Sequence, residues 1–379
     1  MIPRKIDIAE SLRPNKVLIL YGPRQVGKTT LVQQYLSTAP TFPGGIVTQT
    51  GDDIPFANQF SQCDLYFFRS TIPQHSLLFI DEAQRIPNIG RGLKLIIDNI
   101  PGVRVIVTGS SSFDLLQSAG EALTGRKTVA TLYPVSVQEA LSVTDRWDVP
   151  RHLPDYLRYG MYPAVLTATT HQEKESIVRE LAGSYLLKDI LDFDKIKGAR
   201  KIFDVLRLLA FQIGSQVSTQ EVGNTVGIDK NTVARYLDLL EKSFVLYRLD
   251  GFSRNLRKEV SKMSKYYFYD LGIRNAVVSS FNEISMRNDL GQLWENFIVM
   301  ERIKHLSRTR RQANFYFWRT YTKEELDWVE ETGGHLHGYE FKWNKPKVAP
   351  PRGWLETYPE ADFRVIHPEN YLEFVTTPM

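Results

Sequence analysis

The chain has 379 residues and a formal net charge of +4; 42% of its residues are hydrophobic and 24% are charged. This composition is typical of a globular protein with two or three domains, and it excludes the disordered class. No window reaches the roughly 18 apolar residues of a membrane span and no apolar leader follows Met1, so we expect a cytoplasmic protein with no membrane partner. The single cysteine, Cys63, excludes an internal disulfide and a cysteine-rich zinc site.

The basic residues are concentrated in two stretches of the chain. Such clusters attract phosphate groups, although a basic solvent-facing surface without a ligand gives the same pattern. The two clusters consist of Arg254, Arg257, Lys258, Lys262 and Lys265, and of Arg302, Lys304, Arg308, Arg310, Arg311 and Arg319.

The first predicted strand, Val17–Tyr21, leads directly into a glycine-rich loop, and a helix over residues 31–36 follows. In a loop of this kind the backbone N–H groups point at phosphate oxygens, and the N-terminus of the helix adds positive potential. We therefore predict a nucleotide-binding loop rather than a glycine-rich turn with no ligand. Its residues are Gly22, Pro23, Arg24, Gln25, Val26, Gly27, Lys28, Thr29 and Thr30. Lys28 and Thr29 would reach the outer phosphates and magnesium.

Further strands are predicted over residues 77–80, 103–108 and 128–132, with helical stretches between them. This alternation is typical of a parallel sheet covered on both faces, so the predicted fold class is α/β. The strand over 77–80 runs into Asp81 and Glu82, which places two carboxylates at the carboxyl edge of the sheet, beside the phosphate loop. Asp81 would hold magnesium through water, and Glu82 would orient or deprotonate the attacking water.

Two weaker signals complete this predicted site. Thr108 and Ser110 end the third strand and can present a hydroxyl to the terminal phosphate, although Thr-Gly-Ser is also ordinary turn chemistry. Arg126 lies just before the last strand, where a guanidinium could stabilise the charge that develops during phosphoryl transfer. Such arginines often come from a neighbouring subunit, so this reading predicts a homo-oligomer; the alternative is a surface arginine in a loop.

These motifs, together with the stretch Leu-Tyr-Pro-Val-Ser-Val-Gln that ends at Glu139, resemble the predicted AAA+ ATPases of bacteria and archaea that carry a C-terminal domain of unknown function. The resemblance covers nearly the whole chain. It implies that ATP and Mg²⁺ bind, that Ser110 or Thr108 is the sensor and that Arg126 is the arginine finger. It also implies that the turn ending at Pro163 packs near the adenine.

The middle of the chain is predicted to be a winged helix that follows a helix over residues 203–211. Ser218 begins a short helix, Gly227 makes a turn and Asp229 caps a second helix. The exposed side of that helix offers residues that contact phosphates or base edges: Lys230, Asn231, Thr232 and Arg235. Strands over residues 245–249 and 265–269 would bracket a basic wing. Both DNA contact and a plain connecting role fit this pattern.

The last hundred residues hold a second candidate site. A helix carries Glu295, and a hairpin then brings Asp327 near Glu340 and Lys342, which share one face of a strand. Two carboxylates beside a lysine can hold a divalent metal and polarise a phosphodiester. A surface ladder of glutamate and lysine pairs is the alternative.

This order of elements resembles the PD-(D/E)XK nuclease superfamily. The resemblance implies that Asp327 and Glu340 bind Mg²⁺ or Mn²⁺, that Lys342 is the catalytic lysine and that Glu295 is the helix acid. The predicted domains are an AAA+ domain over residues 1–150, a helical and winged-helix domain over 151–280, and a restriction-nuclease-like α/β domain over 281–379.

Three functions are compatible with these residues. The first is an ATP-driven enzyme that binds and cuts DNA. The second is an ATP-controlled DNA-binding regulator with an inactive nuclease fold, and the third is a scaffold that remodels a protein partner without nucleic acid.

Overall fold

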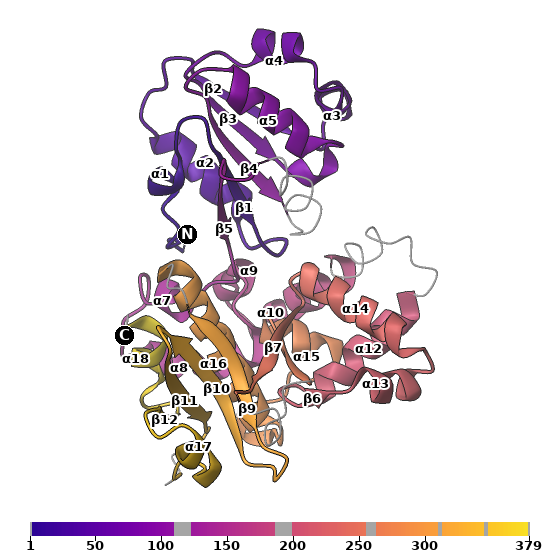
Figure 1. Ribbon diagram of the computed structural model, residues 1–379, viewed down its shortest axis with the longest axis vertical. Helices are drawn as coiled ribbons and strands as arrows, with labels where there is room; N and C mark the ends of the chain where they lie inside the picture. Colours follow the sequence, from indigo (N-terminus) through magenta and orange to yellow (C-terminus); the bar gives the residue numbers. More distant parts are fainter. Residues whose placement is uncertain are drawn as a thin grey trace. The chain divides into compact units, whose positions relative to one another are not determined.

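The computed structural model describes residues 2–109, 123–185, 199–254, 263–309, 313–344 and 348–377. The chain forms two compact units, shown in Figure 1. The N-terminal unit consists of Arg4–Tyr133 with Lys242–Phe244, and the C-terminal unit contains the rest of the chain. The predicted Ser110 and three residues of the first basic cluster (Arg257, Lys258 and Lys262) lie outside the described residues, as do Arg310 and Arg311.

The N-terminal unit is built on a sheet of five parallel strands in the order β2-β3-β4-β1-β5. The strands are β1 (Val17–Tyr21), β2 (Ile46–Thr50), β3 (Leu77–Asp81), β4 (Arg104–Gly109) and β5 (Lys127–Thr131). The four predicted strands are therefore confirmed, each within one residue. The sequence did not reveal β2, because this edge strand is polar and its Ile46 is exposed, so it lacks the apolar run of a buried strand.

Helices complete the N-terminal unit, and one apolar core joins α3, α4 and α5 to the sheet. That core contains Phe60 of α3, Phe68 of α4 and Leu93 of α5, all fully buried against strand residues such as Ile80. The helices are α1 (Ile8–Ser11), α2 (Lys28–Thr38), α3 (Ile54–Ser61), α4 (Leu65–Thr71) and α5 (Ile89–Asn99). The α/β class predicted for this part of the chain is thus confirmed.

The C-terminal unit combines many helices with a second sheet. Its helices are α7 (Val137–Ala140), α8 (Val149–Tyr159), α9 (Pro163–Thr167), α10 (His171–Glu180), α12 (Ala199–Phe211), α13 (Thr219–Val226), α14 (Lys230–Lys242, whose last residue clusters with the N-terminal unit), α15 (Leu271–Val277), α16 (Leu290–Thr309), α17 (Arg352–Thr357) and α18 (Tyr371–Thr376). None of the described helices is both long and apolar enough to cross a membrane.

The caps predicted for the helix pair in the middle of the chain are present in α13 and α14. The Ser218 hydroxyl accepts a hydrogen bond from the Glu221 backbone N–H, and Gly227 ends α13 in a left-handed conformation with φ of 72°. Asp229 accepts hydrogen bonds from the backbone N–H groups of Asn231 and Thr232. Ser218 and Asp229 thus accept hydrogen bonds from N–H groups that have no partner within the helix at its start.

The second sheet has seven strands in the order β12-β11-β10-β9-β7-β8-β6. They are β6 (Gln216–Val217), β7 (Leu246–Phe252), β8 (Ser264–Phe268), β9 (Asn314–Arg319), β10 (Glu325–Thr332), β11 (His335–Phe341) and β12 (Asp362–Ile366). Strands β9, β10 and β11 form an antiparallel meander, and β12 runs parallel to β11. Because β7 pairs with β9, the sheet crosses the boundary predicted near residue 280, and the division into two domains there stays a prediction.

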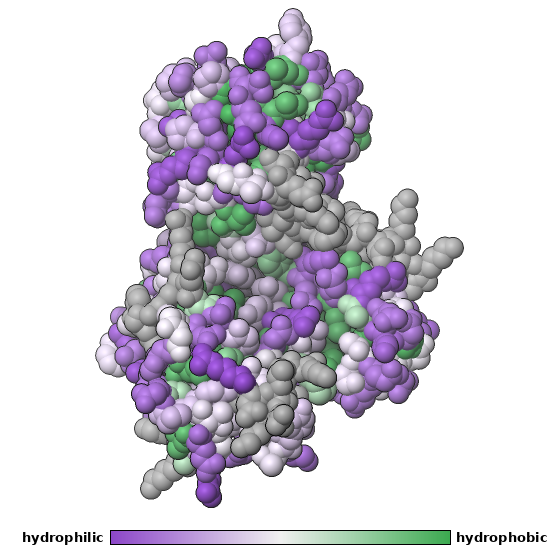
Figure 2. All heavy atoms as spheres, in the orientation of Figure 1, coloured by the Kyte–Doolittle hydropathy of each residue, from purple (hydrophilic) through white to green (hydrophobic). Residues whose placement is uncertain are grey.

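The interpretation of the basic clusters as phosphate-contacting surfaces is wrong for three of their residues. Lys265, Arg302 and Lys304 are buried, each paired with a carboxylate. Arg302, for example, donates to both carboxylate oxygens of Glu330 at 2.6 and 2.9 Å. A buried charge needs such a partner, and a count of basic residues along the sequence cannot reveal it. The visible face of each unit is nevertheless mainly hydrophilic, as Figure 2 shows.

Candidate functional site

The glycine-rich loop of the N-terminal unit turns where two glycines allow it. Gly22 has a φ of 149° and Gly27, which precedes α2, has a φ of 92°. A side chain on Gly22 would place its Cβ 2.1 Å from the backbone oxygen of Leu132. The predicted glycine spacing therefore reflects both a positive φ and a close backbone approach.

The other predicted loop residues surround this turn. Val26 is fully buried, Gln25 has a φ of 58°, and Thr30 lies in the first turn of α2. The Lys28 side chain is buried, and its Nζ donates to the backbone oxygens of Gly22 at 2.9 Å and Pro23 at 2.8 Å. The ammonium is thus held against the loop that the sequence predicts to enclose phosphates.

The structure brings three predicted residues together next to this loop. The Thr29 hydroxyl donates to Asp81, with 3.0 and 2.9 Å to its two carboxylate oxygens. The Thr108 hydroxyl also donates to Asp81 and accepts a hydrogen bond from the Glu82 backbone N–H at 3.2 Å. Strand β4, which carries Thr108, lies between β1 and β3, so parallel pairing alone puts these side chains at one edge of the sheet.

Glu82 is held in an unusual backbone conformation. Its φ of 48° lies in the left-handed region, which non-glycine residues seldom adopt. The Gln84 side-chain amide donates to the Glu82 carboxylate at 2.5 Å. The carboxylate is therefore positioned by a neighbour two residues along the chain, which sequence analysis had not singled out.

Two arginines of the N-terminal unit lie at opposite ends of β1 and β5. The Arg126 backbone oxygen accepts a hydrogen bond from the Val17 N–H at the start of β1, so Arg126 lies at the amino edge of the sheet, whereas Arg4 contacts the loop at the carboxyl edge. Arg126 Nε lies 3.0 Å from the Asp98 carboxylate, and about half of the Arg126 side chain is exposed. Arg4 donates to the backbone oxygens of Val26 at 2.7 Å and Tyr133 at 2.5 Å, so it ties the loop to the end of β5. Arg4 gave no signal in the sequence because its partners are backbone atoms far along the chain.

Pro163 begins α9, which belongs to the C-terminal unit. Its predicted packing against adenine stays a prediction.

The C-terminal unit brings the second set of predicted residues together. Asp327 lies in β10 at a register shift between Leu326 and Val329, and its carboxylate accepts a hydrogen bond from the Phe341 backbone N–H at 2.8 Å. Lys342 forms an ion pair with Glu340. Such register shifts are common next to active sites, where they redirect a side chain.

Lys265, on β8, occupies the centre of this acid cluster. Its ammonium lies 3.1 Å from Glu295, 2.6 Å from Glu325 and 3.8 Å from Asp327, and only 2% of the side chain is exposed. The Tyr267 hydroxyl donates to the same Glu295 oxygen at 2.7 Å. We define the acid cluster as Glu295, Glu325, Asp327 and Glu340 with Lys265 and Lys342.

The electrostatics of the acid cluster are dominated by burial. Burial raises the pKa of Glu295 to about 7, against the opposing effect of Lys265. Burial and the nearby Asp327 charge raise the pKa of Glu340 to about 7 as well. The surrounding carboxylates hold the pKa of Lys265 well above its usual range despite its burial. Carboxylates that titrate near neutral pH are typical of sites that bind metals or transfer protons.

Sequence analysis missed the central role of Lys265, which it assigned to a basic cluster and to a strand beside the predicted wing. Lys265 reaches the cluster only because β7 pairs with β9. This pairing joins β8 to the same sheet as the meander, with β7 as the one strand between β8 and β9. Alternating burial along β8 could not have revealed it, since every residue of this strand is buried.

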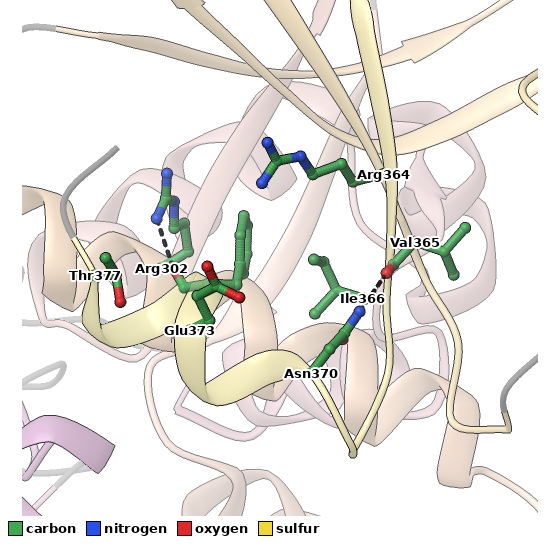
Figure 3. Close-up of a pocket in the computed structure, with 8 residues that line it drawn as sticks. Arg302, Arg364, Val365, Ile366, Asn370, Glu373 and Thr377 are labelled. Carbon is green, nitrogen blue, oxygen red and sulfur yellow. Dashed lines mark hydrogen bonds between the residues drawn. The ribbon is translucent and has the colours of Figure 1, made fainter.

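The C-terminal unit also contains a cavity of about 410 Å³ between β12 and α18 (Figure 3). Arg302 and Arg364 line it together with Glu373 and Asn370, whose amide donates to the Val365 oxygen at 2.9 Å. Since Arg302 is bound to Glu330 and to the Phe374 oxygen, its charge is already satisfied.

Three segments of the chain match known protein families. Residues 14–141 match the AAA domain family, while residues 150–284 and 290–370 match two families described as Domain of unknown function (DUF8612) and Domain of unknown function (DUF4143). Residues 14–141 are thus an AAA-type ATP-binding domain, which bears out the nucleotide prediction.

Similar proteins that align with most of this chain are themselves described as uncharacterized proteins. One from Mycobacterium tuberculosis is 27% identical over 344 residues, which cover 88% of this chain and 72% of that protein. One from Methanocaldococcus jannaschii is 22% identical over 313 residues, which cover 78% and 68%. The structure of NtrX from Brucella abortus in complex with ADP is 14% identical and covers 60% of this chain and 64% of that chain. Its TM-score of 0.27 is too low to indicate a common overall fold.

Proposed function

We propose that this protein hydrolyses ATP with Mg²⁺ in its N-terminal unit. The observation that carries the proposal is the contact of Thr29 and Thr108 with the Asp81 carboxylate beside the glycine-rich loop. A hydroxyl and a carboxylate at this place supply the oxygen ligands that Mg²⁺ prefers, directly or through water. Lys28, already at the loop, would neutralise the phosphate charge.

The remaining residues have distinct roles in this proposal. Glu82 orients or deprotonates the attacking water, and Gln84 keeps its carboxylate in place. Thr108 contacts both Asp81 and the Glu82 backbone, so it can sense the terminal phosphate and report the change to both acids. Ser110 stays the alternative sensor.

The experiment is a measurement of Mg²⁺-dependent phosphate release by the full chain and by Lys28→Ala. We expect Lys28→Ala to lose at least about 10²-fold in turnover, as typically follows the loss of a group that stabilises charge in the transition state. Lys94→Ala is the matched control, because Lys94 is an exposed lysine of α5 in the same unit. Equal turnover by Lys28→Ala and wild type would refute the proposal.

We infer that Arg126 acts on the ATP of a neighbouring subunit in a homo-oligomer. Its half-exposed guanidinium can exchange Asp98 for a phosphate without exposing a buried charge. The test mixes Arg126→Ala with Glu82→Gln, each inactive alone. If the arginine acts across subunits, the mixture regains turnover, because one variant supplies Glu82 and the other supplies Arg126. No recovery in a mixture shown to form mixed oligomers would contradict the inference.

We further propose that α14 contacts DNA as the recognition helix of a winged helix. Lys230, Asn231 and Arg235 are exposed on α14, whereas Val233 and Leu237 face the core. Amide and cationic side chains of this kind bind base edges and phosphates. A purely connecting role for the helix pair is the alternative.

Fluorescence anisotropy with a labelled duplex tests this surface. Lys230→Glu with Arg235→Glu should weaken binding and flatten its dependence on salt, because fewer counterions are released. Arg146→Glu with Arg151→Glu, two exposed arginines elsewhere in the same unit, is the control that makes the same change in net charge. Binding by the double variant that matches the control would favour the connecting role.

A second candidate function is metal-dependent cleavage of phosphodiesters at the acid cluster. Its support is the meeting of Asp327, Glu340 and Lys342 at one end of the β10–β11 hairpin, with Glu295 of α16 linked to them through Lys265. Asp327 and Glu340 would hold Mg²⁺ or Mn²⁺, and Lys342 would polarise the phosphate. The alternative is a regulator in which Lys265 permanently takes the place of the metal.

The discriminating experiment is cleavage of supercoiled and linear DNA in Mg²⁺ or Mn²⁺, with and without ATP. Cleavage that Lys342→Ala abolishes and Lys323→Ala retains would support a nuclease, since Lys323 is an exposed lysine near the same strands. Absence of cleavage from protein that still hydrolyses ATP would favour the regulator, whose DNA affinity should change with ATP and ignore Asp327→Ala. Absence of any DNA affinity would leave the scaffold that remodels a protein partner.

A further inference from the structure

We propose that His335, His337 and Asp362 bind one divalent transition-metal ion of the Zn²⁺ class. The two histidines lie at the start of β11 and Asp362 begins β12, the edge strand of the seven-stranded sheet. In the described part of the chain, no other group of three histidine, cysteine or acidic side chains brings its ligand atoms within 4.8 Å of one another.

The distances between the donor atoms fit one ion. The same Asp362 oxygen lies 3.0 Å from His337 Nδ1 and 3.5 Å from His335 Nε2. Two ligands that each lie about 2.1 Å from a tetrahedral ion are about 3.4 Å apart. The three ligand atoms all lie within 4.8 Å of one another, so an ion can enter once side-chain rotation brings the two imidazoles closer by up to about 1.4 Å.

The strands hold these donors in place. His335 and His337 are two residues apart, so their side chains project from the same face of β11. Asp362 is the direct partner of His337 in the parallel pair of β11 and β12. Only the side-chain rotamers remain to be fixed when the ion binds, which keeps the entropic cost of binding small.

The donor set selects the class of metal. Two imidazoles and one carboxylate suit Zn²⁺, Co²⁺, Ni²⁺ or Cu²⁺, whereas Mg²⁺ prefers oxygen ligands only. Three protein ligands leave one coordination position for water or another donor. The exposed fractions of 49%, 24% and 58% for His335, His337 and Asp362 give the ion direct access from solvent.

The bound ion would pin the edge of the sheet that forms one wall of the cavity in Figure 3. Arg364, two residues beyond Asp362 on β12, lines that cavity. An ion that links β12 to β11 holds the short strand β12 in register. Because the ion binds the folded chain and not the unfolded chain, it also raises the thermal stability of the protein by mass action.

The test is titration of the metal-stripped full chain with Zn²⁺ by calorimetry, and with Co²⁺ by its visible absorption. We expect one equivalent to bind at pH 7.5 and most of the affinity to be lost near pH 5.5, because protons compete for imidazoles. His335→Gln and His337→Gln should each weaken binding at least about tenfold, since even partners of metal ligands contribute that much. His171→Gln is the control, because His171 is an exposed histidine that also lies near an aspartate.

Three outcomes would overturn the proposal. The first is no saturable binding of Zn²⁺ or Co²⁺ by the wild type. The second is binding that His335→Gln and His337→Gln leave unchanged. The third is binding that survives in these variants but is lost in Asp327→Ala, which would place the ion in the acid cluster instead.

Discussion

The two units each place a lysine and carboxylates together, but they do so in opposite ways. In the N-terminal unit, Lys28 donates to backbone oxygens, and Asp81 accepts hydrogen bonds from two uncharged hydroxyls. In the C-terminal unit, the Lys265 ammonium lies directly among Glu295, Glu325 and Asp327.

The difference determines how much negative charge each site retains for a metal ion. A hydroxyl orients a carboxylate without cancelling its charge, so Asp81 keeps the charge that attracts Mg²⁺. In the acid cluster, the Lys265 ammonium lies about 3 Å from the carboxylates and already supplies the positive charge that a metal ion would bring. A metal that enters the acid cluster must therefore compete with Lys265, whereas one that enters beside Asp81 meets no such ammonium in these contacts.

The largest expected effect tests the N-terminal side of this comparison. Glu82→Gln should lower ATP turnover about 10³-fold while ATP still binds, because the amide cannot accept a proton from water. Gln84→Ala should cost less, about tenfold, since it only loosens the Glu82 carboxylate. Turnover and the binding of a fluorescent ATP analogue check both variants. Wild-type turnover in Glu82→Gln would remove Glu82 from the mechanism.

The next effect tests whether Lys265 holds the acid cluster together. Lys265→Met should destabilise the protein by about 3–5 kcal/mol, because removal of one partner leaves buried like charges without a cation. Adding Glu295→Gln to that variant should recover part of the loss, and Mn²⁺ should stabilise Lys265→Met more than wild type. Urea unfolding measures these differences. A loss below about 1 kcal/mol would show that the cluster does not depend on the ammonium.

The third effect separates backbone strain from steric contact in the phosphate loop. Gly22→Ala should cost about 2–3 kcal/mol, because it combines a positive φ with a Cβ 2.1 Å from the Leu132 oxygen. Gly125→Ala is the matched control in the same unit, with a φ of 74° and open space around its Cβ. Its cost should be about 1 kcal/mol. Equal melting temperatures for the two variants would contradict the steric argument.

The last effect is a pH dependence of the free energy of unfolding that arises in the acid cluster. The folded-state pKa of Glu295 is raised from 4.5 to about 7, so the folded protein binds the proton more tightly than the unfolded chain does. This contribution to stability is complete below about pH 4.5 and is lost as the pH rises to about 7. Glu295→Gln should remove about 2–3 kcal/mol of that decline between pH 5 and pH 8, because one pKa unit corresponds to about 1.4 kcal/mol.

Urea unfolding at pH 5, 6, 7 and 8 measures this decline. Glu356→Gln, an exposed glutamate of α17, is the control and should leave the profile unchanged. If the free energy of unfolding of Glu295→Gln declines with pH as much as that of wild type, Glu295 is not the source of the decline.

The sequence by itself determined the phosphate loop, the acids Asp81 and Glu82 at the end of β3 and the strands that carry them. These features depend on residues adjacent in the chain, such as Gly27 beside Lys28, and on apolar runs that must be buried. The caps of α13 and α14 could be predicted for the same reason, because a cap and its helix are only two or three residues apart. The two histidines of β11 and their partner Asp362 were not singled out in the sequence.

Only the tertiary structure decided which charges meet. Lys265 and Glu295 are 30 positions apart, and Arg302 and Glu330 are 28 apart. The pairing of β7 with β9 brings Lys265 to the acids, and the parallel pairing of β12 with β11 brings Asp362 to the histidines. Local pattern fixes secondary structure because its period is local, whereas the energy of a buried charge depends on neighbours that only the folded chain supplies.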